Sequence, residues 1–311
     1  MPGFRTHYLW GQAAKGQDII RAIQKYEHSF NLGLQGPDIF FYSPLAHLLY
    51  EEHLGGQLHN GTRTNAMFLS LFEARDRFHK KEDREICDAY ICGFIGHYTL
   101  DSVVHPYVHY RTKKVKNAHL VNYTFGIHVL LETDMDARIL RHYLGKKTSE
   151  FHCAATIALS KKEQAVVSRL LSLAVETAYP AVHLSPRLVS FAIFCIRIGN
   201  SLLHDTTGRR KAFLRRFDER LIGNSFLSSL IAADFHKTYT DPCNLRHKTW
   251  RNPWNLSITS QESVFDLMDR ATVDFRKRLY MYRKMIRKNE KNRNQLLKHL
   301  GNLSYDSGLT H

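Results

Sequence analysis

Helical spacing of apolar residues dominates the chain. Residues 83–105 and 128–144 each place apolar side chains at the spacing of one helix face. The same spacing predicts further helices at 13–30, 63–79, 161–178, 186–203, 210–233 and 261–300. Alternation of apolar and polar residues, which would indicate strands, is not strong enough to compete. The sequence therefore predicts an all-α fold, a single-domain helical bundle.

The cysteines and the apolar segments indicate which cellular compartment to expect. The five cysteines are an odd number, form no C-x-x-C pair and lie mostly among apolar neighbours, so we expect reduced core thiols. The first twenty residues lack the basic start and continuous apolar core of a secretory signal. The longest apolar run, 188–199, is too short to cross a bilayer and contains Arg197. We expect a cytoplasmic protein that could also lie against the inner face of the membrane.

The net charge selects a class of partner. A formal charge of +15 and a pI near 9.6 favour polyanions, which include nucleic acid, acidic lipid headgroups and phosphate-bearing substrates. Residues 276–300 are dense in Lys and Arg. That segment is either a solvated helix face or a contact with a phosphate-rich surface.

Ionisable residues recur at helical spacing inside the apolar run 93–111. His97, Asp101 and His105 are four residues apart, so they share one face of a helix and could chelate a metal ion. Pro106 disfavours helical angles at the residue before it. We therefore expect the helix to end near His105, and His109 need not stay in line.

A second pair follows at the same spacing. His128 and Glu132 are four residues apart, and Asp136 lies one turn further on. One such pair is commonly a simple hydrogen bond, but two pairs within 36 residues favour metal binding. Imidazole and carboxylate are the ligands of zinc sites that keep a position open for water. Asp136 could orient a liganding imidazole or could be a surface carboxylate.

These motifs, taken in order, resemble those of the zinc-dependent phospholipase C family. The resemblance rests on His7, "GPDIFF" with Asp38, "GGQLH" with His59, "GHYTLDSVVHPY" with His97, Asp101 and His105, and "HVLLE" with His128 and Glu132. It implies an all-helical fold related to the zinc-dependent single-strand nucleases, and residues 241–254 are similar to cytosolic bacterial members. The expected domain spans residues 1–300, with metal motifs in 3–136 and a helical extension in 150–300. Residues 301–311 are expected to form a disordered tail.

The resemblance also implies roles and a cofactor of two or three zinc ions. Asp38, His59, His97 and Asp101 would surround one zinc; His105, His128 and Glu132 would hold a second; His7 would hold a third, bridged by Asp101. Secreted members use an N-terminal tryptophan amine at the third site, which this chain lacks, so Pro2 would have to supply an amine after loss of Met1. Histidines also stand one residue before and three after Pro106, so His109 is the substitute for His105.

Zinc chemistry makes a phosphodiester the natural substrate. Zinc lowers the pKa of bound water toward about 7, so a zinc-bound hydroxide could attack phosphorus. Asp38 could be a ligand or a general base, since both roles need an ionised carboxylate. Three functions stay open: a phospholipase C-like hydrolase acting on phospholipid, a nuclease-type phosphodiesterase acting on nucleic acid, and a non-catalytic, metal-stabilised protein docking on anionic membranes.

Overall fold

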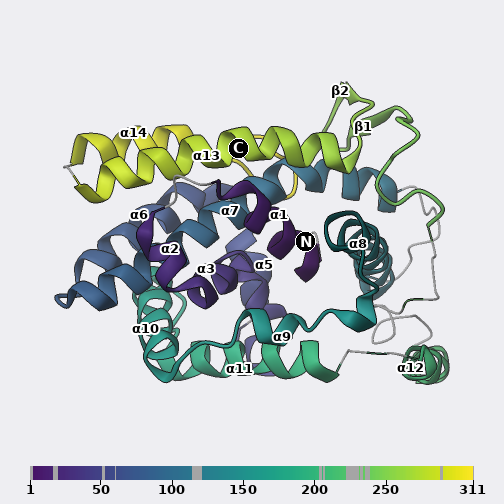
Figure 1. Cartoon of the computed structure of the whole chain (residues 1–311), viewed down its shortest axis with the longest axis horizontal. Helices are drawn as coiled ribbons and strands as arrows, with labels where there is room; N and C mark the ends of the chain where they lie inside the picture. Colours follow the sequence, from purple (N-terminus) through teal and green to yellow (C-terminus); the bar gives the residue numbers. More distant parts are fainter. Residues whose placement is uncertain are drawn as a thin grey trace.

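The computed structural model describes most of the chain and is mostly helical, which confirms the all-α prediction (Figure 1). The described residues are 3–16, 20–50, 53–59, 61–113, 121–202, 205, 207–221, 231, 234, 239–287 and 290–310. Among them, no helix is both long enough and apolar enough to cross a bilayer.

One long helix forms the centre of the molecule. Helix α7 (Lys81–Lys113) is buried from residue 86 to residue 108, apart from the half-buried Val103. Protein therefore surrounds this part of α7 on all sides. Accordingly, α7 packs against α3 (Glu27–Gly33), α13 (Val264–Arg287) and α8 (Val121–Leu144).

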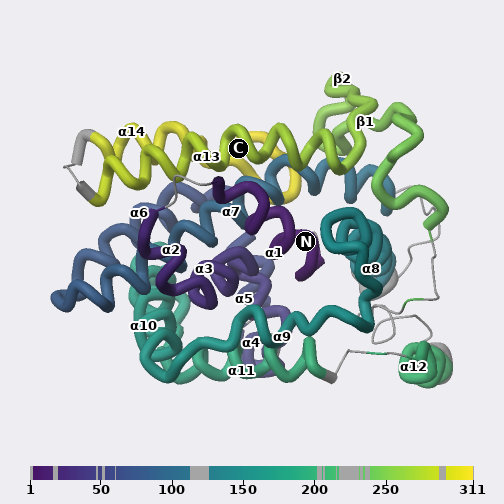
Figure 2. Tube along the Cα trace, in the orientation of Figure 1, coloured from purple at the N-terminus to yellow at the C-terminus, as the bar shows by residue number. Residues whose placement is uncertain are grey.

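The remaining elements complete the molecule. The N-terminal half supplies α1 (Phe4–Ala14), α2 (Arg21–Lys25), η1 (Gly36–Tyr42), α4 (Pro44–Leu48), α5 (Leu54–His59), η2 (Gly61–Arg63) and α6 (Thr64–Asp76). The rest supplies η3 (Thr148–Glu150), α9 (Cys153–Thr156), α10 (Lys161–Ala178), α11 (Pro186–Leu202), α12 (Arg209–Leu221) and α14 (Glu290–Leu300). In Figure 2, α13 and α14 run along one edge of the molecule and α10 and α11 lie toward the opposite edge.

The predicted helix at 161–178 coincides with α10, because its start has a complete capping box. Ser160 Oγ accepts a hydrogen bond from the Glu163 backbone N–H, and the Glu163 side chain accepts one from the Ser160 N–H. The predicted helix at 13–30 is instead divided among α1, α2 and α3. Of the predicted helix at 210–233, residues 222–230 lie outside the described residues.

The prediction that the central helix ends near His105 is wrong. Helix α7 continues through Pro106 to Lys113. Proline removes one backbone hydrogen bond from a helix and its ring crowds the carbonyl four residues earlier. Packing on both sides of Pro106 outweighs this cost: Val104 and Tyr107 are buried, and the Tyr107 ring lies 5.7 Å from that of Trp250. His109 therefore stays on the same helix as His105.

Two C-terminal features were not expected from the sequence. A hairpin of β1 (Trp250–Asn252) and β2 (Asn255–Ser260) packs beside α7. The expectation of a disordered tail after residue 300 does not match this structure, because residues 303–310 form a compact loop closed by a bridge between Leu303 and Thr310. Tyr305 in this loop is buried.

Candidate metal centre

The structure brings the predicted ligands together from separate elements. Helix α7 supplies His97, Asp101 and His105, and α8 supplies His128 and Glu132. The others come from three short N-terminal elements: His7 from α1, Asp38 from η1 and His59 from α5. The four-residue spacing places His97, Asp101 and His105 on one face of α7.

Asp101 lies at the middle of the group. Its Oδ1 is 3.1 Å from His7 Nε2 and 3.8 Å from His105 Nε2. Its Oδ2 is 3.1 Å from His97 Nε2 and 3.7 Å from His59 Nε2. One carboxylate thus faces imidazoles on both sides, which is the arrangement of a bridging ligand.

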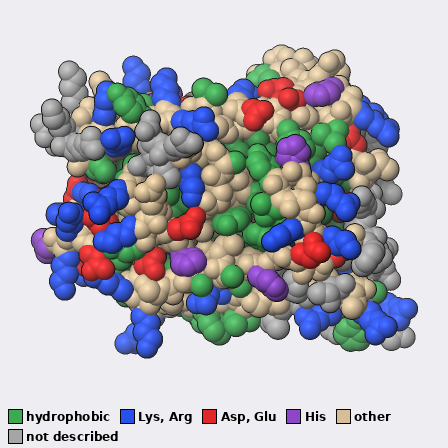
Figure 3. All heavy atoms as spheres, in the orientation of Figure 1, with side chains coloured by type: hydrophobic (Ala, Val, Ile, Leu, Met, Phe, Trp, Pro, Cys, Tyr) green, Lys and Arg blue, Asp and Glu red, His purple; other side chains and the backbone are tan. Residues whose placement is uncertain are grey.

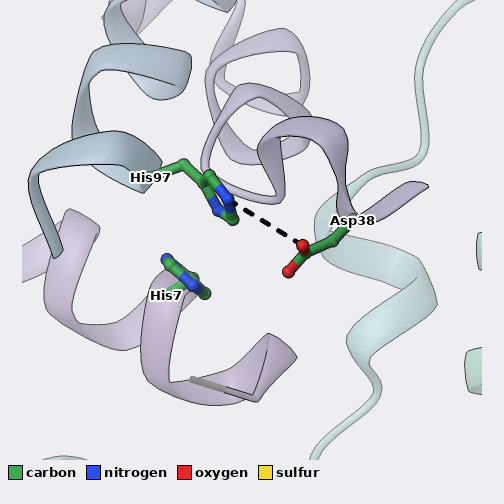
Figure 4. A group of neighbouring side chains, drawn as sticks. All are labelled: His7, Asp38 and His97. Carbon is green, nitrogen blue, oxygen red and sulfur yellow. Dashed lines mark ion pairs between the residues drawn. The ribbon is translucent and has the colours of Figure 1, made fainter. Parts of the chain in front are cut away.

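Asp38 closes the first side of the group. Its Oδ1 lies 3.0 Å from His59 Nε2 and 3.9 Å from His97 Nε2. Figure 4 shows His7, Asp38 and His97 pointing toward one another from three segments of the chain. One ligand atom from each of these three lies within 4.8 Å of the other two, and the same holds for His59, His97 and Asp101.

Glu132 forms the second side. Its Oε1 is 2.8 Å from His128 Nε2 and 3.8 Å from His105 Nε2. One ligand atom from each of these residues also lies within 4.8 Å of the other two. Because Asp101 contacts His105, the two sides form one continuous centre.

Backbone carbonyls fix the orientation of the imidazoles. Nδ1 of His97 lies 3.2 Å from the Leu34 oxygen, and Nδ1 of His59 lies 2.6 Å from the Gly55 oxygen. A carbonyl can only accept, so each Nδ1 carries the proton and each Nε2 offers its lone pair to the centre. This is the outer arrangement that metal-binding histidines use.

Unsatisfied buried atoms test whether a cation fits. In the described part of the chain, both carboxylate oxygens of Asp101, both ring nitrogens of His7 and Nε2 of His105 are buried without a hydrogen bond. Such atoms are rare in folded proteins because the desolvation cost of each is large. A divalent cation would coordinate them, and nitrogen with carboxylate oxygen is a zinc donor set.

Burial and charge set the protonation states. Burial alone would raise the pKa of Asp101, but the charges of His105, His97 and His7 outweigh it and hold the pKa well below its usual value. Burial lowers the pKa of His105 to about 4, against the opposing charge of Asp101. An ionised carboxylate beside neutral imidazole is the state in which both can bind a metal.

Two residues outside the ligand set position it. Gly36, at a φ of +51°, allows η1 to pass His97: a Cβ there would lie 2.3 Å from the imidazole. Asp136 caps α1, accepting hydrogen bonds from the N–H groups of Arg5 at 3.0 Å and Thr6 at 2.8 Å. Neither role expected for Asp136 is correct, because it is buried and places the helix that carries His7.

The C-terminal loop contributes Asp306 to this centre, which was not predicted from the sequence. His109 Nε2 lies 3.2 Å from Asp306 Oδ1, while His105 faces Asp101 and Glu132. One ligand atom from each of His105, His109 and Asp306 also lies within 4.8 Å of the other two. The only signal in the sequence is an acidic residue in a polar segment, which is too common to identify. Pro2, the expected amine donor, lies outside the described residues.

Exposure increases from one end of the centre to the other. The side chains of His7 and Asp101 are 0% exposed, whereas His128 is 16% and His109 is 22% exposed. A substrate would therefore approach from the side of α8 and the C-terminal segment.

Comparison with known proteins agrees with this geometry. Residues 6–181, more than half of the chain, match the family described as zinc dependent phospholipase C. Comparisons with curated proteins and with solved structures give no match. The matched range contains all the residues predicted as zinc ligands, from His7 to Glu132. The chain therefore belongs to the zinc-dependent phospholipase C family.

Proposed function

We propose that this protein is a zinc-dependent phospholipase C-type hydrolase that cleaves the phosphodiester of a phospholipid headgroup. The observation that carries the proposal is Asp101, whose buried oxygens join two imidazole and carboxylate groups into one centre. Multinuclear zinc centres of this kind suit displacement at phosphorus.

The ligand sets follow the two sides of the centre. Asp38, His59, His97 and Asp101 would hold one ion, and His105, His128 and Glu132 a second. His7, 3.1 Å from Asp101, would hold a third that Asp101 bridges. Bound zinc supplies an activated water and positive charge for the phosphoryl oxygens.

Asp38 is the proposed proton acceptor. Its carboxylate is 4% exposed; burial alone would raise its pKa, but the nearby charges of His97 and His59 outweigh burial and lower it. An ionised Oδ1 in this position can orient a water and take up its proton. Its pairing with His59 keeps the carboxylate directed into the centre.

The surroundings of the open end favour a lipid. The Trp254 ring lies 4.8 Å from the ring of His109 and is 44% exposed. Leu256 and Ile258 are two residues apart on β2, so they share one face of the strand, and they are 65% and 41% exposed. Arg251, on the neighbouring strand β1, is also exposed. Apolar side chains beside a cation are suited to a bilayer surface.

The charge distribution on the face drawn in Figure 3 gives less support to nucleic acid as the substrate. On the face drawn in Figure 3, Lys and Arg side chains are spread over many places with Asp and Glu between them. A nucleic-acid footprint usually gathers basic residues along one stripe.

Metal analysis beside a phosphodiesterase assay tests the proposal. The purified protein should contain two or three zinc ions per chain and hydrolyse a short-chain phosphatidylcholine in a chelator-sensitive reaction. Asp101→Asn should lose zinc and lower kcat/KM by more than about 100-fold, because one ligand shared by two ions is weakened. Bound zinc without turnover of any phosphoester would refute the hydrolase. Faster cleavage of single-stranded nucleic acid than of lipid would refute the substrate class.

A further inference from the structure

The C-terminal loop, residues 303–310, packs on α7 at its proline. Pro106 has no N–H to donate to the Ser102 carbonyl. Gly308 lies at that carbonyl: a Cβ there would be 2.3 Å from the Ser102 oxygen, and its φ is +64°. Only glycine permits both this close approach and this backbone conformation without strain. The proline that was expected to end the helix thus marks the place where the loop is seated.

The loop is held in one conformation. The Ser304 N–H donates to the Leu309 carbonyl at 2.9 Å, and the Gly308 N–H donates to the Ser304 carbonyl at 3.0 Å. The Leu303 N–H donates to the hydroxyl of Tyr98 on α7 at 2.9 Å. Tyr305 is 1% exposed. These contacts restrict the backbone on both sides of Tyr305 and Asp306.

Tyr305 and Asp306 direct the loop at the metal centre. The Tyr305 carbonyl oxygen lies 3.0 Å from His105 Nδ1, and Asp306 Oδ1 lies 3.4 Å from the same nitrogen. Asp306 Oδ1 is also 3.2 Å from His109 Nε2. The Tyr305 ring lies 5.1 Å from the ring of His59, on the other side of the centre.

These contacts determine which nitrogen of His105 is available. A carbonyl and a carboxylate both accept, so Nδ1 must carry the proton, and Nε2 then presents its lone pair toward Asp101 and Glu132. A carboxylate beside the N–H also increases the basicity of the liganding nitrogen. His59 and His97 receive their outer contacts from carbonyls at Gly55 and Leu34.

We propose that Asp306 is a positioning residue of the zinc centre and that the C-terminal loop is part of that centre. This inference rests on the proposed function. It extends the centre beyond residues 6–181, the range that matches the family. Asp306 acts through His105 and His109.

A graded series at Asp306 tests the proposal in the full-length protein. The measurement is zinc affinity, by competition with a coloured chelator, together with the number of ions bound. Asp306→Ala should lower the affinity of the protein for one zinc ion by about 10-fold to 100-fold. Asp306→Asn keeps a hydrogen-bond acceptor but loses the negative charge. Its affinity for zinc should therefore lie between those of Asp306→Ala and the native protein. Asp306→Glu should restore part of the affinity.

Asp266→Asn is the matched control. Asp266 also lies beside a histidine in the C-terminal third, 3.6 Å from His247 Nδ1, and asparagine can still cap α13. The zinc affinity of the Asp266→Asn variant should equal that of the native protein. A purely structural role for Asp306 would lower the stability of the zinc-free protein and leave the affinity for zinc unchanged.

A second measurement needs no variant. Adding zinc to the chelated protein should slow hydrogen exchange at the N–H groups of Ser304 and Gly308, because the ion orders His105 and therefore the loop. Unchanged exchange, or native zinc affinity in Asp306→Ala, would overturn the inference while leaving the hydrolase intact. A native protein that binds no zinc would instead overturn the proposed function.

Discussion

Helices α7 and α8 and the C-terminal loop approach the same centre by different means. The helices carry His97, Asp101 and Glu132 at fixed spacing on regular backbone, with side chains almost fully buried. The loop carries Asp306, whose side chain is 45% exposed, on irregular backbone. The comparison shows that the side chains on these two long helices are buried within the centre, whereas the loop presents its carboxylate at the open edge.

Replacing a buried ligand on the helices should have the largest effect. Glu132→Gln keeps the shape of the side chain but removes the charge opposite His128. We expect loss of one zinc ion and a fall in kcat/KM of more than about 100-fold. Metal analysis and the phospholipid assay check this, with Glu82→Gln, on the surface of α7, as the unaffected control. A smaller loss than in Asp306→Ala would reverse the comparison.

Gly36→Ala tests how tightly the backbone of η1 is held against His97. The new Cβ would lie 2.3 Å from the His97 ring at a φ of +51°, so either η1 or the imidazole must move. We expect the zinc-free protein to lose about 3 kcal/mol of unfolding free energy from strain and overpacking. Gly56→Ala is the control, because its Cβ would meet nothing within 4 Å. Equal urea midpoints for the two variants would show that η1 is not tightly held.

The zinc-free protein should become less stable in mild acid. The folded pKa of His105 is about 4, below its usual 6.5, so the unfolded chain binds a proton first as the pH falls. This contribution is present above pH 6.5 and is lost as the pH falls toward 4. It amounts to about 2 kcal/mol between pH 7 and pH 5.

His59 acts in the opposite direction, because its folded pKa is raised. The contribution of His105 is therefore read as the difference between the native protein and His105→Gln in urea titrations with chelator present. The difference should shrink from pH 7 to pH 5. A constant difference would mean that the pKa of His105 is the same in the folded and the unfolded protein.

The smallest effect is expected at the hairpin. Leu256→Ser should reduce hydrolysis of vesicle phospholipid by roughly fivefold, since one exposed apolar contact with the bilayer is lost. Hydrolysis of a short-chain soluble phospholipid should not change. Val273→Ser, at an equally exposed apolar position on α13, is the matched control. An equal loss on both substrates would place Leu256 in the site and not at a membrane contact.

The parts that could be predicted from the sequence are those with local periodicity. The four-residue spacing of His97, Asp101 and His105 is a property of one helix, so it could be recognised without knowing the fold. The family resemblance supplied the ligands that are distant in sequence, such as His7 and Asp38.

The remaining parts depend on tertiary contacts. The break expected at Pro106 follows from local backbone preference, which packing around α7 overrides. Asp306 meets His105 only because Gly308 seats the loop at the Ser102 carbonyl. No spacing rule links these residues, which are about two hundred positions apart in the chain.

The span from His7 to Asp306 has a consequence for biogenesis. In the proposed centre, the first donor leaves the ribosome with α1, but the residue that orients His105 is synthesised only after α14. A nascent chain can therefore collect loosely held metal early, while the final coordination waits for translation to reach the C-terminal loop. In the proposed centre, the ion held by His105 would therefore reach its full affinity only after the C-terminal loop has formed.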